Sequence, residues 1–314
     1  MTISAAGAHA VGDALAVLAM QRARVDAHDH VNVITVRNEY EDGRAAVSLT
    51  PKVRTCRCRA RCHLRHSTVC GAVPRTDLAE LAAASSVLEI PAGTIFIEEG
   101  EPATDHLIVR HGTAAIFKLM PDGRRQIIDF AGPGRLIGPG ASDAAPFSAE
   151  ALEQVRVCRF TRARFGTLLG RFPAMERRLI DIAERALASA QEQMLLLGRK
   201  TARERLASFL LAQSRQAIAF GVPPERVIRL PMSRLDIADY LGLTIETVCR
   251  ALAQLRTDGV IDFHTPSKLM INDAAALERT AHGMDLAPRQ PRPTPARVRA
   301  APTRRVAVAE LCVA

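Results

Sequence analysis

The sequence predicts an α+β protein with a strand-rich segment, one long helix and a C-terminal winged helix-turn-helix. Three observations support this fold class. Short apolar runs separated by turn residues occupy residues 87–160. After Pro173, apolar residues recur at intervals of three and four. Residues 233–252 then have the cap, the glycine and the apolar spacing of two short helices joined by a tight turn.

The strand-rich segment, residues 73–170, is expected to form a β-roll. Turns that contain glycine or proline, such as 91–93, 121–123 and 132–134, separate its apolar runs. Short strands at this spacing are typical of a sandwich or a roll. The predicted strands are residues 87–90, 94–97, 107–109, 114–118, 126–130 and 155–160.

Residues 171–199 are predicted to form a dimerisation helix, because their apolar residues follow one seam with a/d-like spacing. One small roll cannot cover so long a helix, so a second copy of the chain is the simplest partner, which makes a homodimer. An ordinary core helix in a monomer is the alternative. The predicted seam consists of Leu179, Ile182, Ala186, Ala190, Met194 and Leu197.

Residues 200–276 are predicted to form the winged helix-turn-helix domain. Ser233 and Asp236 have the spacing of a capping box at a helix start, and Gly242 permits a left-handed turn at the end of that helix. Thr244 is placed to cap the second helix.

A wing follows the second helix. Residues 259–263 and 268–271 flank a His-Thr-Pro-Ser turn, which is the pattern of a hairpin. A generic helical hairpin is the alternative to a helix-turn-helix, and the presence of a wing disfavours it.

The outer side of the second helix carries the candidate DNA-binding residues. Glu246, Cys249 and Arg250 are expected there, near the helix N-terminus. These are the positions that reach base edges when a recognition helix enters the major groove. Glutamate accepts a hydrogen bond from cytosine N4, and arginine donates two to guanine. Thr247 is a candidate phosphate contact, and we also assign Ser233 and Thr244 to this surface.

The net charge of +9 lies mostly in two flanking segments. Residues 51–66 carry +6 and residues 286–314 carry +5, so the rest of the chain carries −2. The charge therefore does not locate a DNA-binding face. Residues 1–50 are expected to be a disordered extension, and 277–314 a disordered basic tail. No membrane span and no leader segment is evident, so we expect a cytoplasmic protein with no membrane partner.

From residue 62 to residue 272 the chain resembles the CRP/FNR superfamily, and within it the FNR/FnrN/FixK branch. Residues 194–209 and 237–248 carry this resemblance. It implies a sequence-specific transcription regulator, not an enzyme, with a roll like a cyclic-nucleotide-binding domain. It also implies RNA polymerase as a partner and double-stranded DNA related to TTGAT-N4-ATCAA as the target. No paired carboxylates in a motif, no phosphate loop and no Ser/His/Asp pattern point to an enzyme.

At the recognition helix the family pattern is Glu-x-x-Ser-Arg, and Glu246 and Arg250 match it. Cys249 replaces the serine, and a thiol is a poorer hydrogen-bond donor than a hydroxyl. We therefore expect an altered preference at one base pair of each half-site. In the roll, Arg135 stands where cyclic-nucleotide binders have glutamate, and their phosphate-binding arginine is missing, so cyclic AMP is not expected.

Seven cysteines occur, at positions 56, 58, 62, 70, 158, 249 and 312. Such crowding in a cytoplasmic protein suggests metal or redox chemistry. The resemblance implies a [4Fe-4S] cluster that responds to oxygen, within a ligand loop at residues 51–72. The spacing of Cys62 and Cys70 fits that loop, but Arg59 stands at the position of the upstream cysteine. The implied ligands are Cys58, Cys62, Cys70 and Cys158, with Cys56 as the alternative to Cys58.

Three alternatives to the cluster remain open. The first is a zinc site that draws on Cys56, Cys58, Cys62 and Cys70 with His63 or His66. The second is a set of redox-reactive thiols without metal. The third is a FixK-like regulator with no cofactor, controlled by its expression level.

Overall fold

The computed structural model describes residues 54–55, 62, 64–139, 143–219 and 227–284. The chain divides into two compact units, residues 1–191 and 192–314, and helix α4 (Pro173–Arg199) crosses the boundary between them. Each unit is described by itself. The predicted extension at residues 1–50 lies outside the described residues. The predicted tail lies outside them from residue 285 onward, and its first residues belong to a helix that ends at Ala281.

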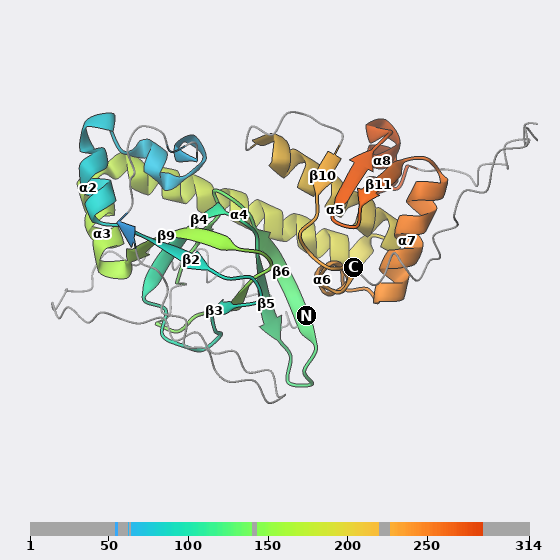
Figure 1. The fold of residues 1–314 in the computed structure, drawn as a ribbon, viewed down its shortest axis with the longest axis horizontal. Helices are drawn as coiled ribbons and strands as arrows, with labels where there is room; N and C mark the ends of the chain where they lie inside the picture. The colour runs from blue at the N-terminus through green and yellow to red at the C-terminus, as the bar shows by residue number, and fades with distance from the viewer. Residues whose placement is uncertain (1–53, 56–61, 63, 140–142, 220–226, 285–314) are drawn as a thin grey trace, which may run out of the picture. The chain divides into compact units, whose positions relative to one another are not determined.

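Unit 1 is a roll of two antiparallel sheets (Figure 1). One sheet has the order β1-β2-β9-β4-β7, and the other has the order β3-β8-β5-β6. The first contains β1 (Arg54–Thr55), β2 (Ser86–Ile90), β9 (Val155–Thr161), β4 (Asp105–His111) and β7 (Leu136–Ile137). The second contains β3 (Ile95–Ile97), β8 (Ser148–Ala151), β5 (Ala114–Leu119) and β6 (Arg125–Ala131).

The six predicted strands are confirmed as β2, β3, β4, β5, β6 and β9, each within two residues at either end. Strands β7 and β8 were not predicted. The first is two residues long, and the second, Ser-Ala-Glu-Ala, has no β-branched or aromatic residue. Their pairing comes from neighbouring strands rather than from their own propensity, since β8 lies between β3 and β5.

Strands β2, β4 and β9 are buried on both faces, because successive side chains point to opposite sides of a sheet. Leu88, Leu107 and Val157 belong to the core between the two sheets. Their neighbours along the strands, Val87, Ile108 and Cys158, belong to a second core that also contains helical residues. The helices of this unit are η3 (Arg65–Ser67), η4 (Val69–Ala72), η5 (Arg75–Asp77), α2 (Leu78–Ala83) and α3 (Arg162–Arg171).

Unit 2 is a winged helix-turn-helix, as the sequence predicts. Its three-stranded sheet has the order β10-β12-β11. After the end of α4 come α5 (Ala202–Ala219), β10 (Val227–Arg229), α6 (Arg234–Leu241), α7 (Ile245–Thr257), β11 (Ile261–Thr265), β12 (Lys268–Ile271) and α8 (Ala274–Ala281).

Helix α8 corrects one predicted boundary. The sequence analysis placed a disordered tail from residue 277, but Leu277, Thr280 and Ala281 are buried in this helix. Asp273 caps it by accepting a hydrogen bond from the backbone N–H of Ala276, at 2.8 Å. The domain therefore continues to the end of α8. Within the described parts of the chain, no helix is both long enough and apolar enough to cross a bilayer.

Candidate DNA-binding surface and cysteine cavity

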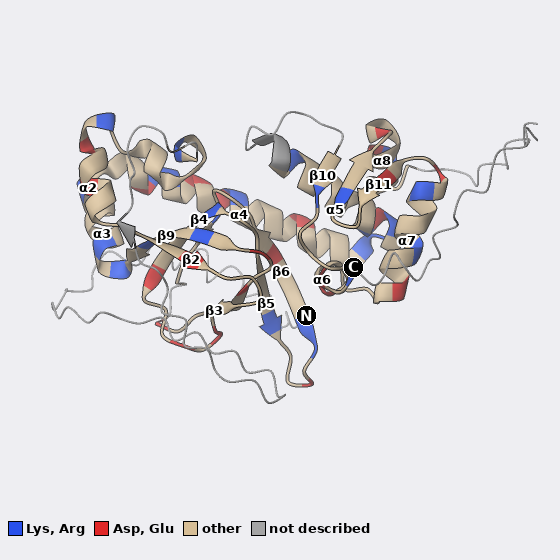
Figure 2. Cartoon of the chain, in the orientation of Figure 1, with Lys and Arg blue, Asp and Glu red and all other residues tan. Residues whose placement is uncertain are grey.

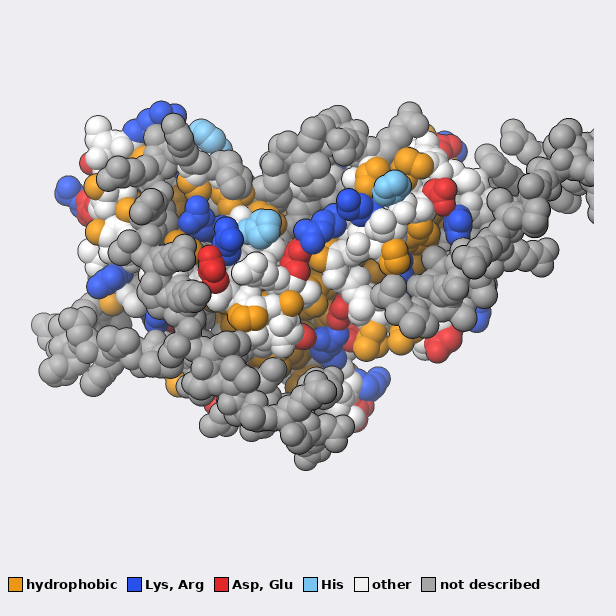
Figure 3. Space-filling model, viewed as in Figure 1, with side chains coloured by type: hydrophobic (Ala, Val, Ile, Leu, Met, Phe, Trp, Pro, Cys, Tyr) orange, Lys and Arg blue, Asp and Glu red, His pale blue; other side chains and the backbone are white. Residues whose placement is uncertain are grey.

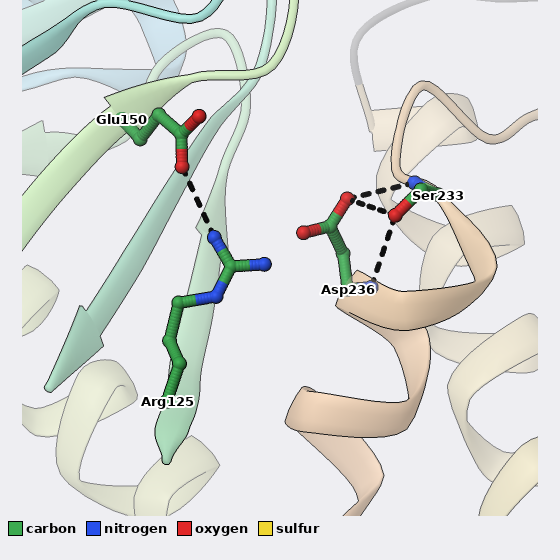
Figure 4. A network of polar contacts seen from close by, with 4 residues as sticks. All are labelled: Arg125, Glu150, Ser233 and Asp236. Carbon is green, nitrogen blue, oxygen red and sulfur yellow. Dashed lines mark hydrogen bonds and ion pairs between the residues drawn. The ribbon is translucent and has the colours of Figure 1, made fainter. Parts of the chain in front are cut away.

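The capping box predicted at the start of α6 is confirmed (Figure 4). The Ser233 hydroxyl accepts a hydrogen bond from the backbone N–H of Asp236 at 3.1 Å. One carboxylate oxygen of Asp236 accepts from the backbone N–H of Ser233 at 2.8 Å and from its hydroxyl at 2.7 Å. The helix start is fixed by its own two side chains. Ser233 is exposed, so the structure leaves its assignment to the DNA-binding surface as a prediction.

The turn between the two helices depends on Gly242. This residue has φ 61° and ψ 45°, the left-handed region that a side chain strains. The backbone N–H of Leu243 then donates to the carbonyl of Ala238 at 3.0 Å, which closes the end of α6. The glycine predicted for this turn is confirmed.

Arg205 of α5 binds this turn, and the sequence analysis missed it. Its guanidinium donates to the Leu241 carbonyl at the end of α6, at 2.9 Å, and lies 3.5 Å from the Gly242 carbonyl. The same side chain donates to the carbonyls of Leu197 and Lys200 at the end of α4, each at 2.9 Å. One residue therefore satisfies the C-terminal carbonyls of two helices. No local pattern reveals this, because the partners lie up to 37 positions away.

Helix α7 presents Glu246 and Arg250 to solvent, as predicted for a recognition helix. Thr244 caps it by accepting from the backbone N–H of Thr247 at 3.3 Å. The pKa of Glu246 is lowered by a hydrogen bond to its own backbone N–H, by one to Thr244 and by the charge of Arg250. An ionised carboxylate and a guanidinium thus lie one helical turn apart on the exposed face.

The predicted position of Cys249 on the outer face is wrong. Its side chain is 4% exposed and belongs with Val248 and Leu252 on the buried face of α7. The reason is helix geometry: three residues advance about 300°, so Cys249 lies only about 60° around the helix from Leu252. It occupies the edge of the buried face rather than the centre of the exposed one.

The wing is confirmed as the hairpin of β11 and β12. Its tip, residues 264–268, is exposed. A third strand, β10, pairs with β12 and was not predicted. Basic and acidic residues are interspersed along the described elements (Figure 2).

The predicted dimerisation seam is partly exposed in the single chain. Leu179 and Ile182 are half-buried and pack against the core of unit 1. Farther along α4, Met194 is 60% exposed, and its neighbours Leu187 and Leu195 are 38% and 58% exposed. Leu197 lies beside the turn, and its Cδ2 atom is 3.5 Å from the position that a Cβ atom on Gly242 would take. Ala186 and Ala190 are half-buried and exposed, respectively. The seam remains a prediction.

Three of the candidate cysteines line one cavity in unit 1. Cys62, Cys70 and Cys158 surround a space of about 20 Å³, together with Arg65 and Arg110. Cys158, on β9, is buried, and the other two are half-buried. All three are thiols rather than disulfides. The structure thus brings together residues that are up to 96 positions apart in the sequence.

Of the remaining candidate ligands, the structure describes His66 alone. Cys56, Cys58 and His63 lie outside the described residues, and His66 lines a different groove, with Arg177 and Arg178. Within the described ranges, no three or more His, Cys, Asp or Glu side chains are grouped so that they could hold a metal ion. The cavity has room for about one water molecule as it stands.

The roll segment that corresponds to a nucleotide-binding cassette carries paired charges. Arg135 forms an ion pair with Asp129 at 2.7 Å. Arg125 forms another with Glu150 at 3.0 Å (Figure 4). A phosphate would have to compete with these carboxylates for the guanidinium groups. The expectation that cyclic AMP does not bind remains a prediction with this physical basis.

Comparisons with known proteins agree with this architecture. Residues 87–172 match the cyclic nucleotide-binding domain, and residues 204–280 match the Crp-like helix-turn-helix domain. The chain is 40% identical over 200 residues to the nitrogen fixation regulation protein FixK of Bradyrhizobium diazoefficiens, covering 64% of this chain and 84% of that protein. It is 33% identical over 219 residues to the transcriptional activator protein FnrL of Cereibacter sphaeroides, covering 69% and 88%.

Among solved structures, FixK2 from Bradyrhizobium japonicum is similar, with a TM-score of 0.58 and 36% identity over 62% of this chain and 96% of that one. The resemblance inferred from residues 194–209 and 237–248 is therefore confirmed. The chain belongs to the CRP/FNR family of helix-turn-helix transcription regulators, in its FixK/FNR branch, and these proteins bind DNA, act as dimers and are not enzymes.

Proposed function

We propose that this protein is a cytoplasmic transcription activator that binds a palindrome related to TTGAT-N4-ATCAA as a homodimer and acts on RNA polymerase. The exposed pair on α7 carries the proposal. Glu246 and Arg250 lie on one face near the helix N-terminus, where a carboxylate accepts from cytosine and a guanidinium donates to guanine. Activation is inferred from similar proteins described as transcriptional activators.

A homodimer matches the symmetry of a palindrome. Two recognition helices about 34 Å apart would meet successive major grooves on one side of the duplex. The exposed apolar residues Leu187 and Met194, with Leu195, give α4 a surface that a second copy would cover.

The test is equilibrium binding of the full chain to a labelled duplex, followed by fluorescence anisotropy at fixed salt. We expect binding to the palindrome to be at least about 1,000-fold tighter than to a duplex with both half-sites scrambled. Equal affinity for the two duplexes, both under air and without oxygen, would falsify the proposed function.

We further propose that the cysteine cavity holds a [4Fe-4S] cluster and makes DNA binding respond to oxygen. Cys62, Cys70 and Cys158 would supply three thiolates, and Cys58 or Cys56 the fourth. The positive charges of Arg65 and Arg110, which line the same cavity, would offset the negative charge of a cluster. Thiolates are the ligands that hold such a cluster in proteins. Because the cavity holds about one water molecule, loading requires the loop that carries Cys62 and Cys70 to move away from the roll.

When bound, such a cluster supplies a reactivity toward oxygen that side chains lack. The protein's own residues would carry the signal to α4. Cys158 lies in the same core as Met175 of α4, and Cys70 packs against that core with Leu179 and Ile182. In addition, Arg178 of α4 donates to the His66 carbonyl at 3.0 Å. A displacement of the cysteine loop therefore disturbs the helix proposed to form the dimer.

Purification without oxygen tests the cluster. We expect a coloured protein with about four irons and four sulfides per chain, which Cys158→Ser removes and Cys312→Ser keeps. Bound zinc in place of iron would favour the zinc alternative. A colourless, metal-free protein that binds the palindrome would support a thiol-redox regulator if thiol oxidants change its affinity, and a cofactor-free regulator if they do not.

A further inference from the structure

A polar groove in unit 1 lies between the short helices η3 and η4 and the N-terminal part of α4. Its volume is about 410 Å³, which is in the range of pockets that bind small molecules. Figure 3 shows basic side chains and a histidine at the edge of unit 1 where these short helices lie. The groove is lined by His66, Gly71, Ala72, Ala174, Arg177, Arg178 and Asp181.

Small side chains on both walls leave this space open. The lining residues of α4 are spaced by three or four positions from Ala174 onward, so they share one face of the helix. On the other wall, Gly71 and Ala72 add little or no side chain. Glycine at position 71 is required by the loop itself, because a Cβ atom there would collide with the carbonyl oxygen of Arg65. The groove can therefore admit a ligand without moving a large side chain.

Two guanidinium groups line the groove, and one of them is held in place. Arg178 donates through Nη2 to the His66 carbonyl at 3.0 Å, and its Nη1 lies 3.9 Å from a carboxylate oxygen of Asp181. Arg177 is exposed and makes no hydrogen bond or ion pair with the residues that the structure describes. An anion would meet one arginine already positioned and a second that can turn toward it without breaking a contact.

The charges of the groove select a class of ligand. A phosphate monoester carries about two negative charges at neutral pH and accepts paired hydrogen bonds from guanidinium groups. Asp181 would repel a second anionic group, but its carboxylate accepts hydrogen bonds from hydroxyls. A groove of about 410 Å³ is also larger than a phosphate ion, so it has room for an attached group.

We propose that this groove binds a small phosphorylated sugar or polyol, with its phosphate on Arg177 and Arg178 and its hydroxyls on Asp181. Such a ligand would add to the hydrogen bond between Arg178 and the His66 carbonyl, and so hold the loop of residues 64–73 against α4. It would give the regulator an input that does not use the cysteine thiols. The inference goes beyond the proposed function and depends neither on DNA binding nor on a cluster.

Calorimetric titration of the full chain, without DNA and at fixed salt, tests the site. The probes are glycerol 3-phosphate, ribose 5-phosphate and glucose 6-phosphate, with inorganic phosphate for comparison. We expect at least one ester to bind at a single site in each chain, at least about 10-fold more tightly than inorganic phosphate. Failure of all three esters to bind, or equal binding of ester and inorganic phosphate, would overturn the proposal.

Three variants assign the contacts. Arg177→Gln should weaken binding of the ester by at least about 10-fold, because a hydrogen bond to a charged group is lost. Asp181→Ala should weaken binding of the ester but strengthen binding of inorganic phosphate, since it removes both an acceptor for hydroxyls and a repelling charge. Arg171→Gln removes an exposed cation of α3 outside the groove and should bind the ester as the unmodified protein does. Equal losses in Arg177→Gln and Arg171→Gln would mean that the ester responds only to the overall charge of the protein.

Amide hydrogen exchange locates the bound ester independently of the variants. Exchange should slow in residues 64–73 and 174–181, because the ligand holds the two walls together, and should not change in the wing, residues 261–271. Slower exchange confined to other segments would place the ligand elsewhere and contradict the proposal. Thermal unfolding confirms that each variant is folded. Arg177→Gln should unfold at the same temperature as the unmodified protein, since it removes no contact among the described residues.

Discussion

The helix-turn-helix and the cysteine cavity are assembled in opposite ways. The cap, the turn glycine and the exposed pair of the helix-turn-helix all lie within residues 233–250. The cavity combines Cys62, Cys70, Ile108 and Cys158, which come from separate elements. A site that depends on local backbone geometry can be predicted from a short stretch of sequence. For a site that tertiary packing assembles, the sequence gives the residue types but not how they come together. Each half of this comparison can be tested by substitution.

The largest effect is expected at Arg250. Arg250→Ala removes the group proposed to donate two hydrogen bonds to guanine, which contributes about 1–3 kcal/mol of discrimination in each half-site. A dimer makes the contact twice, so palindrome affinity should fall by about 30-fold or more. Anisotropy with the specific and scrambled duplexes measures this. Gln254→Ala, an exposed position one turn farther along α7, is the control, and an equal loss in that variant would contradict the assignment.

The second effect concerns the turn rather than the DNA contacts. Arg205→Lys keeps a positive charge but cannot reach the carbonyls of Leu197, Lys200 and Leu241 together. We expect the free energy of unfolding to fall by about 2–4 kcal/mol, because charged hydrogen bonds contribute about 1.5–3 kcal/mol each. Denaturant unfolding measures it.

Arg203→Lys is the matched control for Arg205. Arg203 lies on the same helix and forms an ion pair with Asp258 at 2.6 Å, with both side chains about one-third exposed. Surface pairs of this kind contribute about 0–1 kcal/mol. If the two variants lost equal stability, Arg205 would be an ordinary surface arginine rather than the link between two helix ends.

Arg205 shows where prediction from the sequence stops. Ser233, Gly242 and Thr244 were predicted because each acts on a backbone group within a few positions. The Leu241 carbonyl that Arg205 binds lies 36 positions away, so nothing in the sequence near Arg205 reveals this link. For the same reason β7, β8 and β10 were missed, since such short strands exist only through their neighbours.

Cys249 shows a different limit. The spacing of apolar residues along the helix placed it on the outer side, and the family pattern has a serine at its position, but neither gives the width of the buried face. The same limit applies to the cysteine loop. The family resemblance implied which thiols belong together, and the cavity is lined by three of them, but the size of that cavity follows only from packing.

The third prediction concerns the sheet that carries Cys158. His106 of β4 stacks on Phe165 with ring centres 4.1 Å apart, and its Nδ1 is buried without a hydrogen-bond partner among the described residues. Burial, with a smaller effect of Arg162, lowers the pKa of His106 from 6.5 to about 4. The unfolded chain therefore binds a proton below pH 6.5 that the folded chain refuses until about pH 4.

The direction of the pH effect on stability follows from this difference in proton binding between the folded and the unfolded chain. The contribution of neutral His106 to the free energy of unfolding is complete above pH 6.5. It is lost as the pH falls toward 4, by up to about 1.4 kcal/mol per pH unit. Denaturant unfolding at pH 7, 6 and 5 should show His106→Gln losing stability less steeply than the unmodified protein. His111→Gln, an exposed position on the same strand, should keep the full slope. Parallel curves for all three proteins would contradict the lowered pKa, because they would mean that His106 binds its proton equally well in the folded and the unfolded chain.

The smallest effect is expected at Ser233, where the structure constrains the predicted DNA contact. The hydroxyl has one proton, and it donates that proton to Asp236. Phosphate oxygens are acceptors, so a Ser233 that forms the capping box has nothing to donate to DNA. Ser233→Ala should lower the free energy of unfolding by about 1 kcal/mol, whereas Ser233→Asn, which keeps a capping oxygen, should lose only a few tenths. Palindrome affinity should be the same for both folded variants. If both bound the palindrome more weakly than the unmodified protein, the hydroxyl would have to leave its cap and donate to the DNA backbone in the complex.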